Sequence, residues 1–126
     1  MKRILLLVAA GLIFSSAQAQ DDEDSVVVLP DDAQKCVLPA SPDAIPDEAT
    51  LDQLKAAKAD IADFQGKIMV FRECLQAVEA DPDNTAGNNE AIIQSFNYSV
   101  EMEERVAARF NDAVRDYKAR KAAAES

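Results

Sequence analysis

The feature that most constrains this chain is a pair of long apolar stripes with helical spacing, separated by a short polar turn. The first stripe alternates spacings of three and four residues and consists of Leu54, Ala57, Ile61, Phe64, Ile68, Phe71, Leu75 and Val78. The second has near-heptad spacing and consists of Ile92, Phe96, Val100, Glu103, Ala107, Phe110, Val114 and Tyr117. Such spacing predicts two helices that bury one face each along a coiled-coil-like seam.

Capping and breaking residues indicate where these helices begin and end. Thr50 and Gln53 have the form of a capping box, and Asp81-Pro82-Asp83-Asn84 is a strong turn. We expect a second helix from Asn88 to Ala122, so residues 50–122 form an all-α antiparallel two-helix hairpin and residues 123–126 are disordered. Matching the ends gives the pairs Leu54 with Tyr117, Ile61 with Phe110, Phe71 with Val100 and Leu75 with Phe96.

The first 19 residues have the organisation of a secretory signal peptide. Lys2 and Arg3 precede an apolar run, Ile4 to Phe14, and Ala17-Gln18-Ala19 forms a small-residue cleavage site. The run is too short to span a bilayer, so we expect no membrane span. Cleavage after Ala19 removes Lys2 and Arg3, which changes the net charge from -10 to -12. The product is expected to be periplasmic or secreted.

Export makes a disulfide between Cys36 and Cys74 the expected state of the two cysteines. A helix from Thr50 to Cys74 rises about 36 Å. The arm, residues 36–49, can span about 43 Å in polyproline form. The bond therefore requires the arm to run back along the first helix nearly extended, which its residues Pro39, Pro42 and Pro46 favour.

Residues 20–35 are acidic and predict a disordered tail. Its one apolar run, Val26 to Leu29, could add a strand to a partner's sheet or cover the chain's own domain. Gly66, inside the first predicted helix, either marks a close approach of the arm or has no special role.

Composition weighs against several functions. A net charge of -10 disfavours nucleic acid as a partner, and the absence of His removes the usual general base. We therefore expect a non-enzymatic protein without a cofactor. One alternative is a carboxylate-dependent hydrolase built on Glu103, which interrupts the second stripe opposite Ile68. The other assignment for Glu103 is an ion pair with a flanking cation, Lys67 or Arg72.

The acidic interhelical segment offers a candidate calcium loop. Glu79, Asp81, Asp83 and Glu90 stand at positions one, three, five and twelve of an EF-hand-like spacing. Asn84 occupies the position where the motif has Gly, and no second loop exists to pair with it. The alternative to calcium binding is an acidic turn without a metal.

The end of the second helix is basic, with Lys118, Arg120 and Lys121 in or near its last turn. The hairpin returns this end to the acidic part of the arm, so these charges either neutralise the arm or bind an anionic ligand. A heptad row beside the second stripe either bonds to the arm or is a solvated face; it contains Asn97, Glu104, Asn111 and Lys118.

Several short motifs together resemble a family of small uncharacterised exported proteobacterial proteins. They are Cys36 with the spaced prolines, Cys74-Leu75, Glu101-Met102-Glu103-Glu104, Ala108-Arg109-Phe110-Asn111 and Tyr117-Lys118-Ala119-Arg120. The resemblance covers residues 36–120 and implies a Gram-negative periplasmic setting, without residue roles. We expect a helical interaction or envelope-associated protein that forms a homodimer through an exposed apolar strip, or binds a periplasmic protein through its tail or an apolar helix face.

Overall fold

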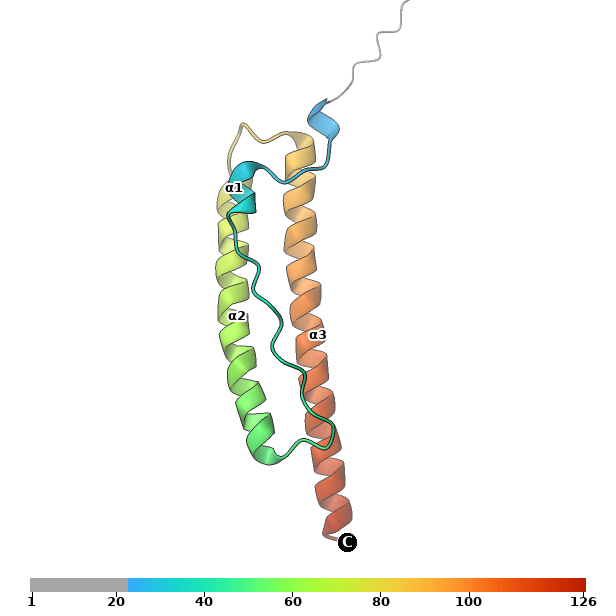
Figure 1. Cartoon of the computed structure of the whole chain (residues 1–126). Helices are drawn as coiled ribbons and strands as arrows, with labels where there is room; N and C mark the ends of the chain where they lie inside the picture. Colours follow the sequence, from blue (N-terminus) through green and yellow to red (C-terminus); the bar gives the residue numbers. More distant parts are fainter. Residues whose placement is uncertain (1–22) are drawn as a thin grey trace, which may run out of the picture.

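The computed structural model describes residues 23–126, which form an antiparallel hairpin of two long helices crossed by an extended arm (Figure 1). The elements are η1 (Glu23–Ser25), α1 (Asp31–Gln34), α2 (Leu51–Glu79) and α3 (Ala86–Ala124). The predicted all-α hairpin is confirmed, although α3 is longer at both ends than expected and includes residues 123–124. The predicted signal peptide lies outside the described residues.

Side-chain caps determine where both long helices begin. Thr50 Oγ1 accepts a hydrogen bond from the Gln53 backbone N–H at 3.2 Å, and Gln53 Oε1 accepts one from the Thr50 N–H at 2.9 Å. This is the predicted capping box. Thr85 and Asn88 form a second one at the start of α3. Asn88 is shorter than the Glu or Gln usual at this position, which is why the sequence pattern did not reveal it.

Two apolar clusters along the hairpin form the core. One contains Phe71, Leu75 and Ile92 with Phe96 packed against this cluster, which places Leu75 and Phe96 in the same part of the core, as expected. The other joins Phe64 and Ile68 of α2 to two α3 residues outside the predicted stripe, Met102 and Val106. The buried face of α3 is wider than a two-helix seam requires because the arm covers a further part of it.

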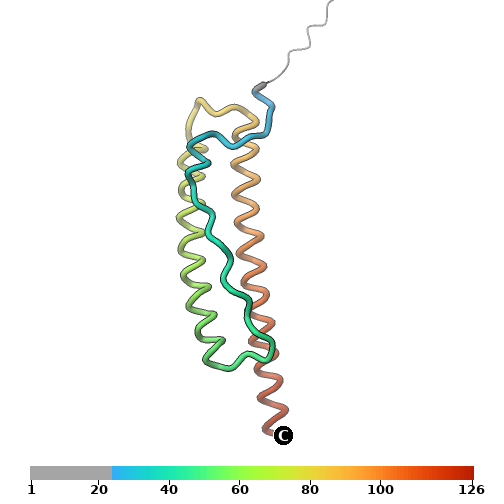
Figure 2. The backbone as a smooth tube through the Cα atoms, in the orientation of Figure 1, coloured from blue at the N-terminus to red at the C-terminus, as the bar shows by residue number. Residues whose placement is uncertain are grey.

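The arm runs back from Cys36 to Thr50 without regular secondary structure and crosses from α2 towards α3 on its way (Figure 2). Its end is held by Ala49, which is 2% exposed and whose carbonyl accepts a 2.8 Å hydrogen bond from Arg120 Nη2. Glu48 just before it has a φ of 54°, in the left-handed region, where the chain turns into α2. The extended, proline-containing arm is therefore as predicted.

Residues 23–35, which we call the head segment, differ from the disordered tail that their composition predicted. Val26 to Leu29 pass over the start of α3, and the Val28 carbonyl accepts a 2.8 Å hydrogen bond from Asn88 Nδ2. In α1, Ala33 is buried in the cluster of Phe71 and Leu75. The disulfide two residues after α1 holds the head segment beside this apolar surface. The composition of the segment alone gives no information about this covalent link.

The two glycines of the hairpin have opposite environments. A Cβ on Gly66 would meet no atom within 4 Å, so the suggested close approach of the arm at this position is wrong. A Cβ on Gly87 would instead collide with the Val26 carbonyl. Gly87 is therefore the residue that lets the head segment lie against α3.

This contrast predicts opposite effects for two identical substitutions. We expect Gly66→Ala to raise the free energy of unfolding by about 0.5–1 kcal/mol, because alanine favours an exposed helix interior. Gly87→Ala should lower it, because the head segment must move away. Urea denaturation measures both values, and amide hydrogen exchange should show lost protection at the N–H groups of Ala33 and Gln34, which donate to the Pro30 carbonyl, only in the second variant. Equal stabilisation by both would contradict the close contact at Gly87.

Candidate functional site

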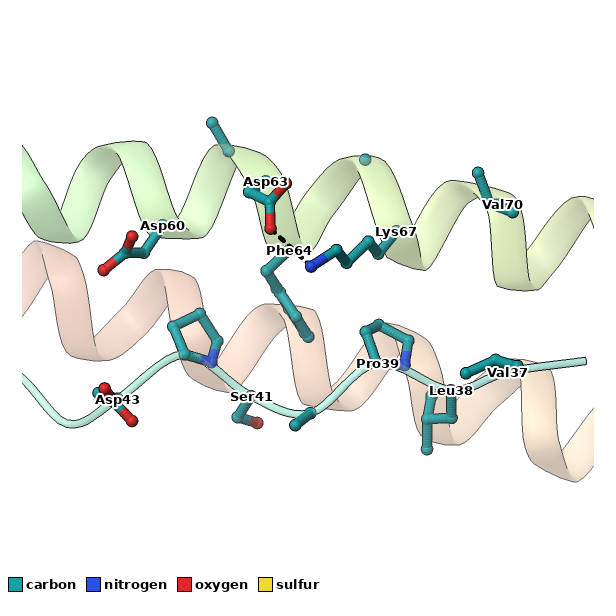
Figure 3. A pocket seen from close by; sticks show the side chains of 14 residues that line it. Val37, Leu38, Pro39, Ser41, Asp43, Asp60, Asp63, Phe64, Lys67 and Val70 are labelled. Carbon is teal, nitrogen blue, oxygen red and sulfur yellow. Dashed lines mark ion pairs between the residues drawn. The ribbon is translucent and has the colours of Figure 1, made fainter.

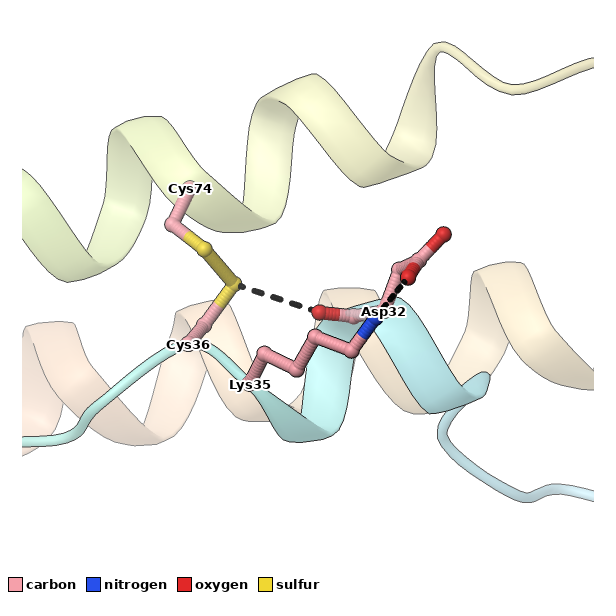
Figure 4. Close-up of a disulfide and its surroundings, with 4 residues drawn as sticks. All are labelled: Asp32, Lys35, Cys36 and Cys74. Atoms are coloured by element: carbon pink, nitrogen blue, oxygen red, sulfur yellow. Dashed lines mark hydrogen bonds and ion pairs between the residues drawn. A yellow bond between two sulfur atoms is a disulfide. The ribbon is translucent and has the colours of Figure 1, made fainter.

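A disulfide joins the arm to α2 at the end of the hairpin that carries the interhelical loop. Cys36 and Cys74 are bonded with a Cα–Cα distance of 5.7 Å, as predicted (Figure 4). Cys36 Sγ also lies 4.0 Å from the Asp32 carbonyl oxygen, a contact only, since an oxidised sulfur has no hydrogen to donate. Lys35 donates to the Asp32 carboxylate at 2.7 Å, and this hydrogen bond lowers the pKa of Asp32. The Cys36–Cys74 disulfide and α1 lie two residues apart along the chain, and we call them together the clasp.

The arm leaves a shallow groove beside α2. Figure 3 shows Phe64 of α2 pointing towards the arm between Pro39 and Ser41, while Lys67 turns along the helix to pair with Asp63 at 2.8 Å. Phe64 is 3% exposed, so the arm forms part of its cover. Of the charged side chains here, Lys67 and Asp63 pair with each other on α2, and Asp43 and Asp60 are exposed.

A second, more apolar groove of about 780 Å³ lies beside the clasp, and we call it the clasp groove. Its floor is buried core, including Phe71 and Leu75. Its rim consists of large apolar side chains that are between 37% and 52% exposed, namely Val27, Val28, Leu38 and Tyr98. These residues come from the head segment, the arm and α3, so no single stretch of sequence predicts the groove.

Glu103 lies in an ion pair across the hairpin. Its Oε2 is 2.7 Å from Arg72 Nη2, and the two side chains are 29% and 19% exposed. Arg72 Nε also donates at 2.9 Å to Ser99 Oγ, and this hydroxyl donates to the Phe96 carbonyl at 2.6 Å. Ser99 is fully buried. The geometry corresponds to the ion-pair alternative, with Arg72 as the partner, and Ser99 is the member of the network that the sequence did not suggest.

The four calcium candidates are not gathered into one group. Among residues 23–126, no three Asp, Glu, Cys or His side chains lie close enough to hold a metal ion. Asp81 instead accepts a hydrogen bond from the Asp83 N–H at 2.9 Å, and Asn84 donates to the Val78 carbonyl at 2.7 Å. These bonds build the turn and cap the end of α2, as an acidic turn requires.

Two other sequence-based expectations can be placed. The heptad row of Asn97, Glu104, Asn111 and Lys118 is exposed, and within the described residues none of the four bonds to the arm. Arg120 makes that bond instead. The basic end of α3 also forms no ion pair with the acidic part of the arm, residues 43–48, in this region of the structure.

The fold and its surface define a class: a disulfide-clasped helical hairpin with an apolar groove at the clasp. Within residues 23–126, no helix combines the length and apolar character needed to cross a membrane. Comparison of the chain with models of protein families, with curated proteins and with solved structures finds no match. Functional inference therefore rests on the sequence and the geometry of this molecule.

Proposed function

We propose that this is an exported, extracytoplasmic and non-enzymatic protein that binds a protein partner of the cell envelope. The disulfide supports an oxidising compartment, because such bonds are rare where glutathione and thioredoxin keep thiols reduced. The signal-peptide pattern of residues 1–19 supports the same setting. The family resemblance adds a Gram-negative periplasm as the specific compartment.

The clasp groove is the observation that carries the proposed binding function. Val27, Val28, Leu38 and Tyr98 together expose an apolar surface over a floor of core residues. Contiguous exposed apolar surface is costly in water and commonly marks a protein interaction site. The clasp holds these side chains in position before binding, which reduces the entropy lost when a partner docks. An apolar partner segment is the complementary occupant.

Glu103, the carboxylate suggested for catalysis, supports a non-enzymatic function by its engagement. Glu103 is paired with Arg72 between the helices, and Ser99 is buried and hydrogen-bonded at both its donor and acceptor functions. A carboxylate and a hydroxyl used in this way stabilise the hairpin. Arg72 contacts both of them and joins them in one network across the hairpin.

Site-specific photocrosslinking in the exported protein tests this proposal. A photoreactive residue at Tyr98 should yield one discrete adduct, whereas the same residue at exposed Gln65, outside the clasp groove, should yield none. Leu38→Glu and deletion of residues 20–29 should each abolish the adduct. A band at twice the protomer mass would identify the partner as a second copy. Equal labelling from both positions, or none from either, would refute the proposed site.

A further inference from the structure

A separate groove of about 340 Å³ lies at the opposite end of the hairpin, where α3 extends beyond the start of α2 (Figure 1). We call it the lysine groove. Its floor is apolar and consists of Leu54, Phe110, Val114 and Tyr117, with the exposed Leu51 at its edge. Its rim carries four cations, two from each long helix, which are Lys55, Lys58, Lys118 and Lys121.

These four lysines have no acidic partner in the described part of the chain. The ion pairs of residues 23–126 use Lys35, Lys67, Arg72, Arg105 and Arg115. Of the four rim lysines, only Lys121 lies in the last turn of α3, where the helix dipole favours a cation. Ion pairing with acidic side chains of the same chain therefore does not explain the position of the four lysines. Their positive charges repel one another, which opposes their collection around one apolar floor.

The charge of the whole molecule limits what can occupy the lysine groove. The chain carries a net charge of -10, and Asp112 and Asp116 lie on the same stretch of α3 as the groove. An acidic protein or an anionic bilayer would bring many negative charges close to these carboxylates and be repelled. A ligand with one negative charge can bind the lysines with little repulsion from these carboxylates. The apolar floor of the groove is complementary to an alkyl chain.

We infer that the lysine groove binds a single-chain amphiphilic carboxylate of the fatty-acid type. Its alkyl chain lies along Leu54, Phe110 and Val114, and its carboxylate lies among the lysine ammonium groups. The groove volume of about 340 Å³ is within the range of small-molecule sites. This inference does not depend on the proposed protein partner, whose site is at the other end of the hairpin.

Titration calorimetry of the disulfide-bonded chain with dodecanoate below its micelle concentration provides the test. We expect one binding site per chain. Decanoate should bind roughly fifteenfold more weakly, because it lacks two methylenes that dodecanoate buries in the groove. Dodecanol, which has the chain without the charge, should bind about tenfold more weakly or worse. Equal affinity for dodecanol and dodecanoate would overturn the inference, and so would absence of binding to either.

Matched charge reversals separate a local site from general electrostatics. K118E/K121E should weaken dodecanoate binding about tenfold or more, while K35E/K67E, with the same change in net charge, should change it less than about twofold. All four positions are exposed, and unchanged circular dichroism would show that both variants fold. Equal loss in both variants would overturn the inference. Binding to anionic phospholipid vesicles but not to monomeric dodecanoate would do so as well, since the groove would then recognise a bilayer surface.

Discussion

Replacement of both cysteines, C36A/C74A, is expected to lower the free energy of unfolding by about 4 kcal/mol. The bond closes a loop with a sequence separation of 38, and the chain-entropy model gives that value for a loop of this length. The clasp also holds α1 and the head segment against the core cluster of Phe71 and Leu75. In a domain of this size the melting temperature should fall by about 20 °C. Differential scanning calorimetry measures the change.

Reduction of the parent protein is the matched control for this substitution. A phosphine reductant should reproduce most of the loss in the parent and have no effect on C36A/C74A. Alkylation of the denatured protein without reductant should add no label to the parent, because both cysteines are bonded. A melting temperature unaffected by reduction would mean that the hairpin is stable without its clasp and would contradict the prediction.

Arg72→Ala is expected to lower the free energy of unfolding by about 2 kcal/mol, the second-largest effect. It leaves Glu103 without its cation and removes a hydrogen bond from the fully buried Ser99. Arg72 also lies over the Phe96 ring, at 5.7 Å from the centroid. Partial exposure of the ion pair keeps the expected loss below that of a fully buried pair. Urea denaturation provides the measurement.

Two further variants show whether this loss comes from the network. Arg105→Ala removes an i,i+4 pair with Glu101 that lies on the surface, so it should change stability by less than about 0.5 kcal/mol. The double variant R72M/E103L should recover most of the loss, because it removes both charges and fills the space with apolar atoms. If Glu103→Gln leaves the free energy of unfolding unchanged, the carboxylate does not stabilise the fold through an ion pair. The result would then favour the alternative in which Glu103 is a functional carboxylate.

The parts of the fold that could be predicted are those encoded by local spacing. The stripe containing Ile68 and Leu75 repeats at helical intervals, and Thr50 and Gln53 are three residues apart, so neighbours along the chain carry the information. The disulfide and the path of the arm could be predicted from the rise of the helix between Thr50 and Cys74 and from the length that residues 36–49 can span. Only two cysteines exist, and only an extended, proline-containing segment can bring Cys36 to Cys74.

The candidate sites could not be predicted because each joins side chains from elements that are distant in sequence. Tyr98 and Leu38 share the clasp groove, although 60 positions separate them. Gly87 lies against Val26, and nothing in the sequence around Gly87 indicates this contact. Met102 and Val106 lie outside the predicted stripe because near-heptad spacing describes contact with one neighbouring helix, whereas α3 contacts both α2 and the arm.

The amino-acid sequence by itself determined the hairpin, the cap of its first helix, its disulfide and the path of its arm, because periodicity, capping and chain length act between residues that are close in sequence or linked covalently. Only the tertiary structure decided that the acidic head segment folds onto α3, that Glu103 pairs with Arg72, and that four lysines remain unpaired around an apolar groove. Those outcomes depend on which side chains meet across the hairpin, and burial and desolvation at such contacts have no counterpart in local spacing.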